Sequence, residues 1–381
     1  MMKKWITWGA LALLIGCSAP EKNEFVIKGN ISSYPADILI LAYQIDGKFT
    51  LDTIRIDNGR LSYKKQLTDT IVASVVSRDN NNNIKVEKGV IPGESITVFM
   101  CPGTVLELQV DNRSWPEIQM KGGLLNDDLM KLYAKTMPLK REAFDLLRQL
   151  QEMNLSEEDK AKLQEKRGKL NEEAEQEKIR FVKENPDSYA ALYLLSGMRN
   201  SMTLEEYIAV FNRTNIQLQQ TALGEKIAQQ IQMALASAVG AAAPDFKKKD
   251  KEGNTVQLAD YKGKYVLLDF WGSWCGPCRA SHPHLKALQA HYGPQGLEVI
   301  NIAQENGADA RKIWLKAVEE DQMTWTQILN NEDREVCDVV KLYGITAFPT
   351  KVLIDPEGKI IVKTVGESAP IDEKLKEVFG N

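Results

Sequence analysis

The chain has 381 residues, of which 43% are hydrophobic and 26% are charged, and both values are ordinary for a soluble globular protein. This length is typical of two or three domains. The composition argues against a collagen-like chain, wholesale disorder and a membrane protein with many spans. The formal net charge of −4 argues against a nucleic-acid-binding surface, and five cysteines are too few for a disulfide-dense scaffold.

The first 17 residues, MMKKWITWGALALLIGC, have the pattern of a secretory signal. Two lysines precede twelve mostly apolar residues, too few to span a bilayer core about 30 Å thick. The ending Leu14-Ile15-Gly16-Cys17 resembles a bacterial lipobox, which implies removal of residues 1–16 and lipidation of Cys17. The alternative is an ordinary signal peptide that contains a cysteine. We therefore expect a protein of the cell envelope, lipid-anchored to a membrane and facing the periplasm.

Residues 17–122 have the pattern of a β domain. Short runs rich in β-branched residues alternate with turn signals such as Asp46-Gly47, Asn58-Gly59 and Pro102-Gly103. Their spacing predicts an antiparallel sandwich or open barrel, and no catalytic constellation lies within it. The predicted strands are Phe25–Ile31, Ile38–Tyr43, Phe49–Ile56, Ile71–Val76, Ser95–Met100 and Val105–Val110.

Residues 123–242 have the pattern of helices followed by a linker. Charged side chains are dense between Leu139 and Asn185, and Ser156 followed by Asp159 is typical of a helix N-cap. The charges indicate either the solvated faces of a helical hairpin or a partner-binding surface. The small residues of Ala234–Ala243 predict a helix end and a linker.

Residues 243–381 alternate between strands and helices, which is typical of an α/β domain with helices on both faces of its sheet. Together, the three regions predict a multidomain fold with an N-terminal antiparallel β module, a central helical region and a C-terminal α/β domain. The predicted strands of the last domain are Lys264–Phe270, Leu297–Ala303, Thr324–Leu329 and a hairpin of residues 350–355 and 359–364. Its predicted helices are Cys278–His291, Ala308–Glu320, Val336–Tyr343 and Ile371–Phe379.

A Cys-X-X-Cys motif follows the first of these strands. The strand leads into Trp274-Cys275-Gly276-Pro277-Cys278, and a helix begins inside the motif. A cysteine at a helix N-terminus lies near unpaired N–H groups and the positive end of the helix dipole, which favour the thiolate. The thiolate is the nucleophile of disulfide exchange, and a second cysteine one turn later can close a disulfide. The motif predicts redox chemistry.

Other chemistries fit the motif less well. A zinc knuckle needs more ligands than the nearby His282 and His284 supply. Haem attachment needs a histidine where this chain has Arg279, and a peroxiredoxin has Thr or Ser where this chain has Gly272. We therefore expect no metal and no cofactor. The three histidines, which include His291, are expected to be surface or packing residues.

The C-terminal motifs resemble those of the thioredoxin superfamily. The segments DFWGSWCGPCR, GITAFPT and TKVLIDPEGKIIVK are similar to the thioredoxin fold. The lead-in APDFKKKDKEGNTVQLADYKGKYVLL and the extra segment Ala308–Leu329 resemble the TlpA/ResA-like thiol:disulfide oxidoreductases, and this match covers residues 243–381. The upstream part resembles Bacteroidetes lipoproteins with an uncharacterised N-terminal module. The resemblance therefore implies a C-terminal α/β thioredoxin fold.

The resemblance also implies roles for individual residues. Cys275 is expected to be the exposed nucleophile and Cys278 the more buried resolving thiol of a redox-active disulfide. Asp269 matches a buried acid beneath Cys278, with a partly solvated strand-end carboxylate as the alternative. Pro349 matches a cis-proline that faces the disulfide, next to backbone groups that can pair with an extended substrate. The expected substrate-binding residues are Trp274, Gly276, Pro277, Phe348 and Pro349.

The expected activity is reduction of disulfides in exported proteins. The resemblance implies a membrane dithiol electron donor, and apocytochrome c as one target of a role in cytochrome c maturation. Gly276-Pro277 occurs in thioredoxin, whose potential of about −270 mV is that of a reductant. The alternatives are a disulfide oxidase or isomerase, or a ligand-binding lipoprotein whose thioredoxin-like domain serves one dedicated partner. Cys101 and Cys337 are expected to be small buried hydrophobes outside the redox relay, with a disulfide between them as the alternative.

Overall fold

The computed structural model describes residues 22–31, 37–45, 48–77, 83–86, 89–93, 95–110, 118–152 and 155–380. The chain divides into two compact units, Met1–Ala191 and Leu192–Asn381, and each is described by itself. The predicted signal segment, including Cys17, lies outside the described residues. Among the described helices, none combines the length and the apolar composition that crossing a membrane requires.

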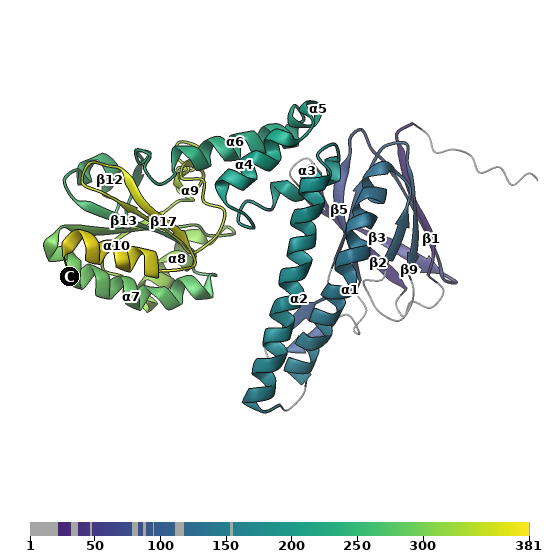
Figure 1. Ribbon diagram of the computed structural model, residues 1–381, viewed down its shortest axis with the longest axis horizontal. Helices are drawn as coiled ribbons and strands as arrows, with labels where there is room; N and C mark the ends of the chain where they lie inside the picture. Colours follow the sequence, from purple (N-terminus) through teal and green to yellow (C-terminus); the bar gives the residue numbers. More distant parts are fainter. Residues whose placement is uncertain are drawn as a thin grey trace, which may run out of the picture. The chain divides into compact units, whose positions relative to one another are not determined.

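The first unit is built on a sheet of eight strands in the order β10-β9-β1-β4-β3-β2-β5-β8. Figure 1 shows this sheet, with β1, β2, β3, β5 and β9 labelled. All neighbours are antiparallel except β1 and β9, which run parallel. Because most of the described strands join one sheet instead of two packed sheets, the open-barrel alternative fits better than the sandwich. The strands of this unit are β1 (Glu24–Asn30), β2 (Ile38–Ile45), β3 (Lys48–Asp57), β4 (Arg60–Gln66), β5 (Ile71–Ser77), β6 (Asn83–Val86), β7 (Gly89–Pro92), β8 (Ile96–Met100), β9 (Val105–Val110) and β10 (Ile118–Lys121).

Strand β4 was not predicted from the sequence, although its hairpin turn was. The strand RLSYKKQ has one buried residue, Leu61, and contains no β-branched residue, so its composition does not indicate a strand. The neighbouring turn, Asn58-Gly59, has both residues at positive φ, as a tight hairpin turn requires. The pairing of β1 with β4 therefore depends on the turn and on the shared core more than on the composition of β4.

Two long helices, α1 (Leu124–Glu152) and α2 (Glu157–Glu184), form the predicted hairpin. Helix α1 packs on the sheet through Met130, Tyr133 and Met137, which contact its apolar core. At its beginning, the buried Asn126 accepts a hydrogen bond from the Phe99 amide and donates one to the Phe99 carbonyl, which joins α1 to β8. These contacts fix the helix on the sheet.

Helix α2 begins where the sequence predicts. Ser156 is its N-cap, and the Ser156 hydroxyl accepts a hydrogen bond from the Asp159 amide. Most of its charged side chains are exposed, and its buried residues are Ala174, Ile179, Phe181 and Val182. The next helix, α3 (Tyr189–Ser196), contains the division between the two units.

The second unit joins a short helical segment to a five-stranded sheet with the order β15-β14-β13-β16-β17. Strands β13, β14 and β15 are parallel, whereas β16 and β17 pair antiparallel. The elements are α4 (Leu204–Arg213), α5 (Ile216–Gln219), α6 (Ala222–Ala236), β11 (Lys247–Lys249), β12 (Thr255–Gln257), η2 (Leu258–Tyr261), β13 (Tyr265–Trp271), α7 (Gly276–Tyr292), η3 (Gly293–Gln295), β14 (Leu297–Ala303), α8 (Ala310–Glu320), β15 (Thr326–Leu329), α9 (Val339–Leu342), β16 (Thr350–Ile354), β17 (Ile360–Val365) and α10 (Ala369–Phe379).

The two faces of this sheet are covered differently. Apolar residues of α7, α8 and α10 pack on one face. The other face is covered mainly by the segment of β11, β12 and η2 and by the short α9. Helix α9 is shorter than predicted because Asp338 caps it, accepting a hydrogen bond from the Lys341 amide. The α/β thioredoxin-like fold implied by the sequence is confirmed.

The close approach of β1 and β9 can be tested at Gly29. A Cβ atom at this position would lie 2.1 Å from the Leu108 carbonyl oxygen, so Gly29→Ala should lower the free energy of unfolding by about 1–3 kcal/mol. Gly168 in α2 has no neighbouring atom within 4 Å of such a Cβ, so Gly168→Ala should raise it by about 0.5–1 kcal/mol. Urea unfolding followed by circular dichroism measures both. A Gly29→Ala protein as stable as the wild type would contradict the close approach.

Candidate active site

The site is built where β13 ends and α7 begins. Cys275 is the N-cap of α7, and its sulfur accepts a hydrogen bond from the Cys278 amide at 3.2 Å. Pro277 lies in the first turn, where its missing N–H leaves no hydrogen bond unmade. Cys275 and Cys278 form a disulfide with a Cα–Cα distance of 5.3 Å. Because Cys275 caps the helix, α7 begins at Gly276, two residues before the predicted start.

The two cysteines differ in exposure less than expected. Cys275 is only 6% exposed and Cys278 is completely buried. The order implied by the resemblance is retained, but the expectation of an exposed Cys275 is wrong for the disulfide form. Both residues belong to the apolar core cluster on the α7 face of the sheet, and Phe348 packs against that cluster. In the disulfide form, little of Cys275 is therefore exposed to solvent.

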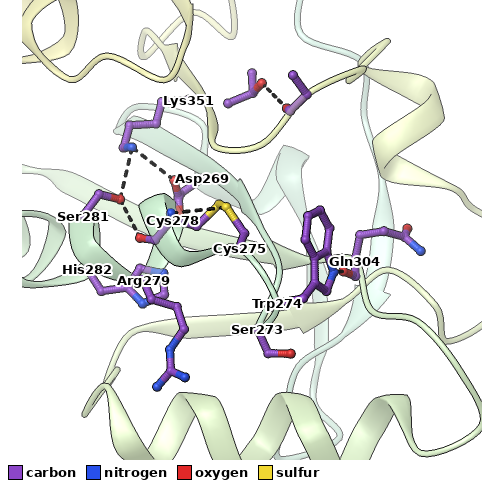
Figure 2. Close-up of a disulfide and its surroundings, with 12 residues drawn as sticks. Asp269, Ser273, Trp274, Cys275, Cys278, Arg279, Ser281, His282, Gln304 and Lys351 are labelled. Carbon is purple, nitrogen blue, oxygen red and sulfur yellow. Dashed lines mark hydrogen bonds and ion pairs between the residues drawn. A yellow bond between two sulfur atoms is a disulfide. The ribbon is translucent and has the colours of Figure 1, made fainter. Parts of the chain in front are cut away.

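Trp274 directly precedes Cys275, and 54% of the residue is exposed. Its indole N–H donates a hydrogen bond to the Gln304 carbonyl at 2.9 Å (Figure 2). Its ring meets the Phe348 ring edge to face, with 5.6 Å between the ring centroids. A Cβ at Gly272 would lie 2.5 Å from the indole nitrogen and 2.8 Å from the Gln304 oxygen. Glycine at 272 is therefore required by the position of Trp274.

The loop before β16 supplies the remaining predicted residues. The peptide bond between Phe348 and Pro349 is cis, and the Pro349 carbonyl accepts a hydrogen bond from the Gly366 amide at 2.9 Å. Phe348 is half-buried and Pro349 buried. The structure thus brings Trp274 and Phe348 together beside the disulfide.

Asp269 lies on β13 and is completely buried. Its Oδ2 accepts a hydrogen bond from the Asn301 amide at 3.1 Å, and its Oδ1 is 3.6 Å from the Lys351 ammonium. Burial raises the pKa of Asp269, while the nearby Lys351 and His282 act in the opposite direction. The alternative of a partly solvated carboxylate is excluded by this burial.

Lys351 is a site residue that the sequence analysis missed. It is 1% exposed and lies opposite Asp269 in the β13–β16 ladder. Figure 2 shows contacts that run from Asp269 to Lys351, from Lys351 to the Ser281 hydroxyl at 3.4 Å, and from Ser281 to the Cys278 carbonyl at 2.8 Å. A charged residue inside the otherwise apolar strand TKVLI was the available signal.

Asp321, the residue that follows α8, joins the end of that helix to α7 through charged and polar contacts. Asp321 accepts hydrogen bonds from the Arg279 guanidinium at 2.6 and 3.0 Å and lies 2.7 Å from His282 Nδ1. Burial opposes its ionisation, but hydrogen bonds from Arg279 and His282 hold the pKa of Asp321 below its usual range. His282 is 1% exposed and packs edge-on against Trp271, so it is a packing residue as predicted.

The turn before Cys275 is held by Glu305, a second residue that the sequence analysis missed. Glu305 is 3% exposed, and its carboxylate accepts hydrogen bonds from the Ser273 amide at 2.7 Å and the Ser273 hydroxyl at 2.6 Å. Its own amide donates to the Asn331 side chain. A glutamate after a strand is common, so the sequence carries no clear signal for this role.

Two further cysteines among the described residues are not part of this motif. Cys101, in the first unit, and Cys337, in the second, are unpaired and partly buried. Burial raises the pKa of the Cys101 thiol. The alternative of a Cys101–Cys337 disulfide is therefore not present in this structure.

Comparison with known proteins gives matches to both ends of the chain. Residues 239–363 match the AhpC/TSA family, and residues 25–129 match DUF4369, a domain of unknown function. A thiol-disulfide oxidoreductase ResA from Bacillus thuringiensis is 32% identical over 142 residues, covering 37% of this chain and 78% of the relative. ResA from Geobacillus thermodenitrificans is 37% identical over 125 residues, covering 33% of this chain and 68% of the relative.

Solved structures give similar matches. The thioredoxin domain of a thiol-disulfide oxidoreductase from Bacteroides vulgatus is 36% identical, with 37% of this chain and 98% of that domain covered and a TM-score of 0.34. A thiol:disulfide interchange protein from a Bacteroides species is 34% identical, with 38% of this chain and 93% of that protein covered and a TM-score of 0.34.

Glu305→Ala tests how the Cys275 turn is held. The substitution leaves the Ser273 N–H and hydroxyl without their acceptor, so it should cost about 1–3 kcal/mol of unfolding free energy. Hydrogen exchange at the Ser273 amide should become faster in the oxidised protein. Glu335→Ala, at an exposed position, is the control and should change neither quantity. Unchanged exchange at Ser273 in Glu305→Ala would show that the turn is held by other contacts.

Proposed function

We propose, since this chain belongs to the ResA family of thiol-disulfide oxidoreductases, that it reduces disulfide bonds in exported proteins. The observation that carries this proposal is Cys275 at the N-cap of α7, where its sulfur accepts a hydrogen bond from the Cys278 amide. That hydrogen bond and the helix dipole stabilise negative charge on the sulfur. Cys275 is therefore the thiol best suited to attack a substrate disulfide.

The reaction consists of two exchanges. In the reduced protein, the Cys275 thiolate attacks one sulfur of the substrate disulfide, forms a mixed disulfide and displaces the other sulfur as a thiolate. The Cys278 thiol loses its proton and attacks the Cys275 sulfur, which closes the Cys275–Cys278 disulfide and releases the second substrate thiolate. The substrate gains two electrons and two protons, and an external dithiol restores the reduced protein.

The positions of the two sulfurs support this order. Cys275 is 6% exposed, whereas Cys278 is completely buried. Trp274 and Phe348 form an apolar surface next to Cys275, against which a residue beside the substrate cysteine can pack. Gly276 and Pro277 lie at the beginning of α7, where no side chain of Gly276 obstructs the approach. Pro349 supports the loop whose backbone is available to an extended substrate.

Asp269 is proposed to accept the proton that Cys278 loses. The carboxylate is buried, and the contacts through Lys351 and Ser281 connect it to the Cys278 end of α7. Because burial raises its pKa, Asp269 is a better proton acceptor than an exposed aspartate. The nearby Lys351 ammonium lowers the pKa of Asp269 and so opposes part of the effect of burial.

The direction of electron flow and the location are part of the same proposal. Gly276-Pro277 and the resemblance to thioredoxin favour a reductant over an oxidase or isomerase, with a membrane dithiol as the electron donor. The N-terminal sequence favours the cell envelope, with a lipid anchor at Cys17 and the protein facing the periplasm. Apocytochrome c and other exported thiol proteins are the proposed substrate class.

Reduction of insulin by the full-length protein tests this general activity, because a protein with one dedicated partner should reduce insulin poorly.

The order of attack can be tested by trapping. Cys278→Ser should accumulate mixed disulfides through Cys275, since no thiol remains to resolve them. Cys275→Ser should abolish disulfide reduction and trap no substrate. Non-reducing electrophoresis of both proteins, purified from a native envelope, followed by mass spectrometry identifies the partners. Trapping through Cys278 in Cys275→Ser, and none in Cys278→Ser, would reverse the assignment.

The role of Asp269 predicts a pH dependence. Only the ionised carboxylate accepts a proton. The rate at which the wild type resolves the mixed disulfide should therefore increase, relative to that of Asp269→Asn, as the pH rises through the raised pKa of Asp269. Above that pKa, Asp269→Asn should resolve the mixed disulfide about 100-fold more slowly. Stopped-flow measurement of substrate release between pH 6 and 9 gives both rates. Asp309→Asn, at an exposed position, is the control, and equal rates for Asp269→Asn and wild type at every pH would exclude the role.

A further inference from the structure

The loop that precedes β16 has backbone groups available for a partner. Among the described residues, no hydrogen bond joins the Phe348 N–H or C=O to another group, although the neighbouring Ala347 carbonyl accepts one from Thr350. Thr346, two residues before Phe348, is exposed. An extended segment that pairs with Phe348 would satisfy these groups in the same way as an added strand.

The same loop is joined to the segment that precedes the thioredoxin-like domain. The Thr346 hydroxyl donates a hydrogen bond to the Asn200 side-chain oxygen at 2.8 Å, across 146 residues of sequence. Asn200 is exposed and lies in the turn between α3 and α4. The turn is anchored on one side by the buried Met198 and on the other by the Thr203–Glu206 capping box of α4.

Helix α6 holds the beginning of the loop. Gly344 has a positive φ, and a Cβ there would lie 3.2 Å from the Ala234 backbone nitrogen. The Ser237 hydroxyl donates to the Tyr343 carbonyl at 2.7 Å, and the Lys363 ammonium donates to both of these oxygens at 2.7 Å. The segment of α4 to α6 and the loop are therefore held together at two places.

The distances along the chain place Asn200 within reach of a bound substrate. Thr346 and Phe348 are separated by at most about 7 Å of backbone. A substrate segment of four residues in an extended conformation spans about 13 Å. An extended segment that pairs with Phe348 and runs toward Thr346 is thus long enough to reach Asn200. Trp274 and Phe348 supply an apolar surface at the other end of this path.

We propose that the α3–α4 turn is part of the substrate-binding surface, and that Asn200 contacts the polypeptide segment flanking the substrate disulfide. The occupant is an extended segment of a protein substrate with an apolar residue near its cysteine and a polar residue two or three positions away. The inference rests on the proposed reductase function. It assigns substrate selection in part to residues outside the thioredoxin-like domain.

Charge substitutions at Asn200 test this assignment. Two peptide disulfides are used that differ only at the positions three residues on either side of the cysteine, which are Glu in one peptide and Lys in the other. Asn200→Lys should raise the second-order rate constant for the Glu peptide and lower it for the Lys peptide, each about threefold at low salt. Asn200→Glu should do the reverse, and 1 M salt should reduce both effects.

Matched substitutions at Gln217 are the control. Gln217 is exposed on α5, which precedes the 15-residue α6, so it is about 20 Å from the end of α6 that holds the loop. Gln217→Lys and Gln217→Glu should leave the ratio of the two peptide rates unchanged. Misfolding would change both rate constants in the same direction, so it cannot cause opposite responses of the two Asn200 variants. The proposal is overturned if the ratio of the Glu-peptide rate constant to the Lys-peptide rate constant is the same in both variants. Reduction of neutral 4,4′-dithiodipyridine by the wild type tests the reductase function separately.

Discussion

The amide groups in the first turn of α7 have no carbonyl partners within the helix, and one of them donates to the sulfur of Cys275. This interaction requires the chain to leave β13 and turn sharply before the helix begins. Gly272 provides room for Trp274, and Glu305 binds Ser273 in the same turn. The reactive sulfur is thus positioned by backbone geometry, and the surrounding side chains hold that geometry.

The pair formed by Asp269 and Lys351 lies beneath this helix. Burial of two charged groups is costly and seldom adds to stability, because desolvation offsets much of their attraction. Such pairs are common at sites where a group must gain or lose a proton. The antiparallel register of β13 and β16 places the two residues opposite each other. In the proposed mechanism, this pair serves the proton transfer at the disulfide.

The thioredoxin-like domain does not hold the loop before β16 alone. Lys363 on β17 donates to oxygens of Ser237 and Tyr343, at the C-terminal ends of α6 and α9. Helix C-termini carry partial negative charge, so an ammonium is favoured there. Burial, together with the nearby Arg199, lowers the pKa of Lys363 to about 8. The preceding helical segment is therefore an integral part of the second unit. Ser237, which accepts a hydrogen bond from Lys363, lies in Ala234–Ala243, the stretch whose small residues predicted a helix end and a linker.

The sequence by itself determined the features that depend on local chemistry. The position of Cys275 at a helix start, the Ser156 cap and the alternation of strands and helices follow from short-range patterns of residues. The burial of Cys275, the pairing of Asp269 with Lys351, the binding of Ser273 by Glu305 and the contact between Asn200 and Thr346 were decided by tertiary structure. Each joins residues far apart in the chain, and such contacts depend on strand register and packing, which local periodicity does not encode.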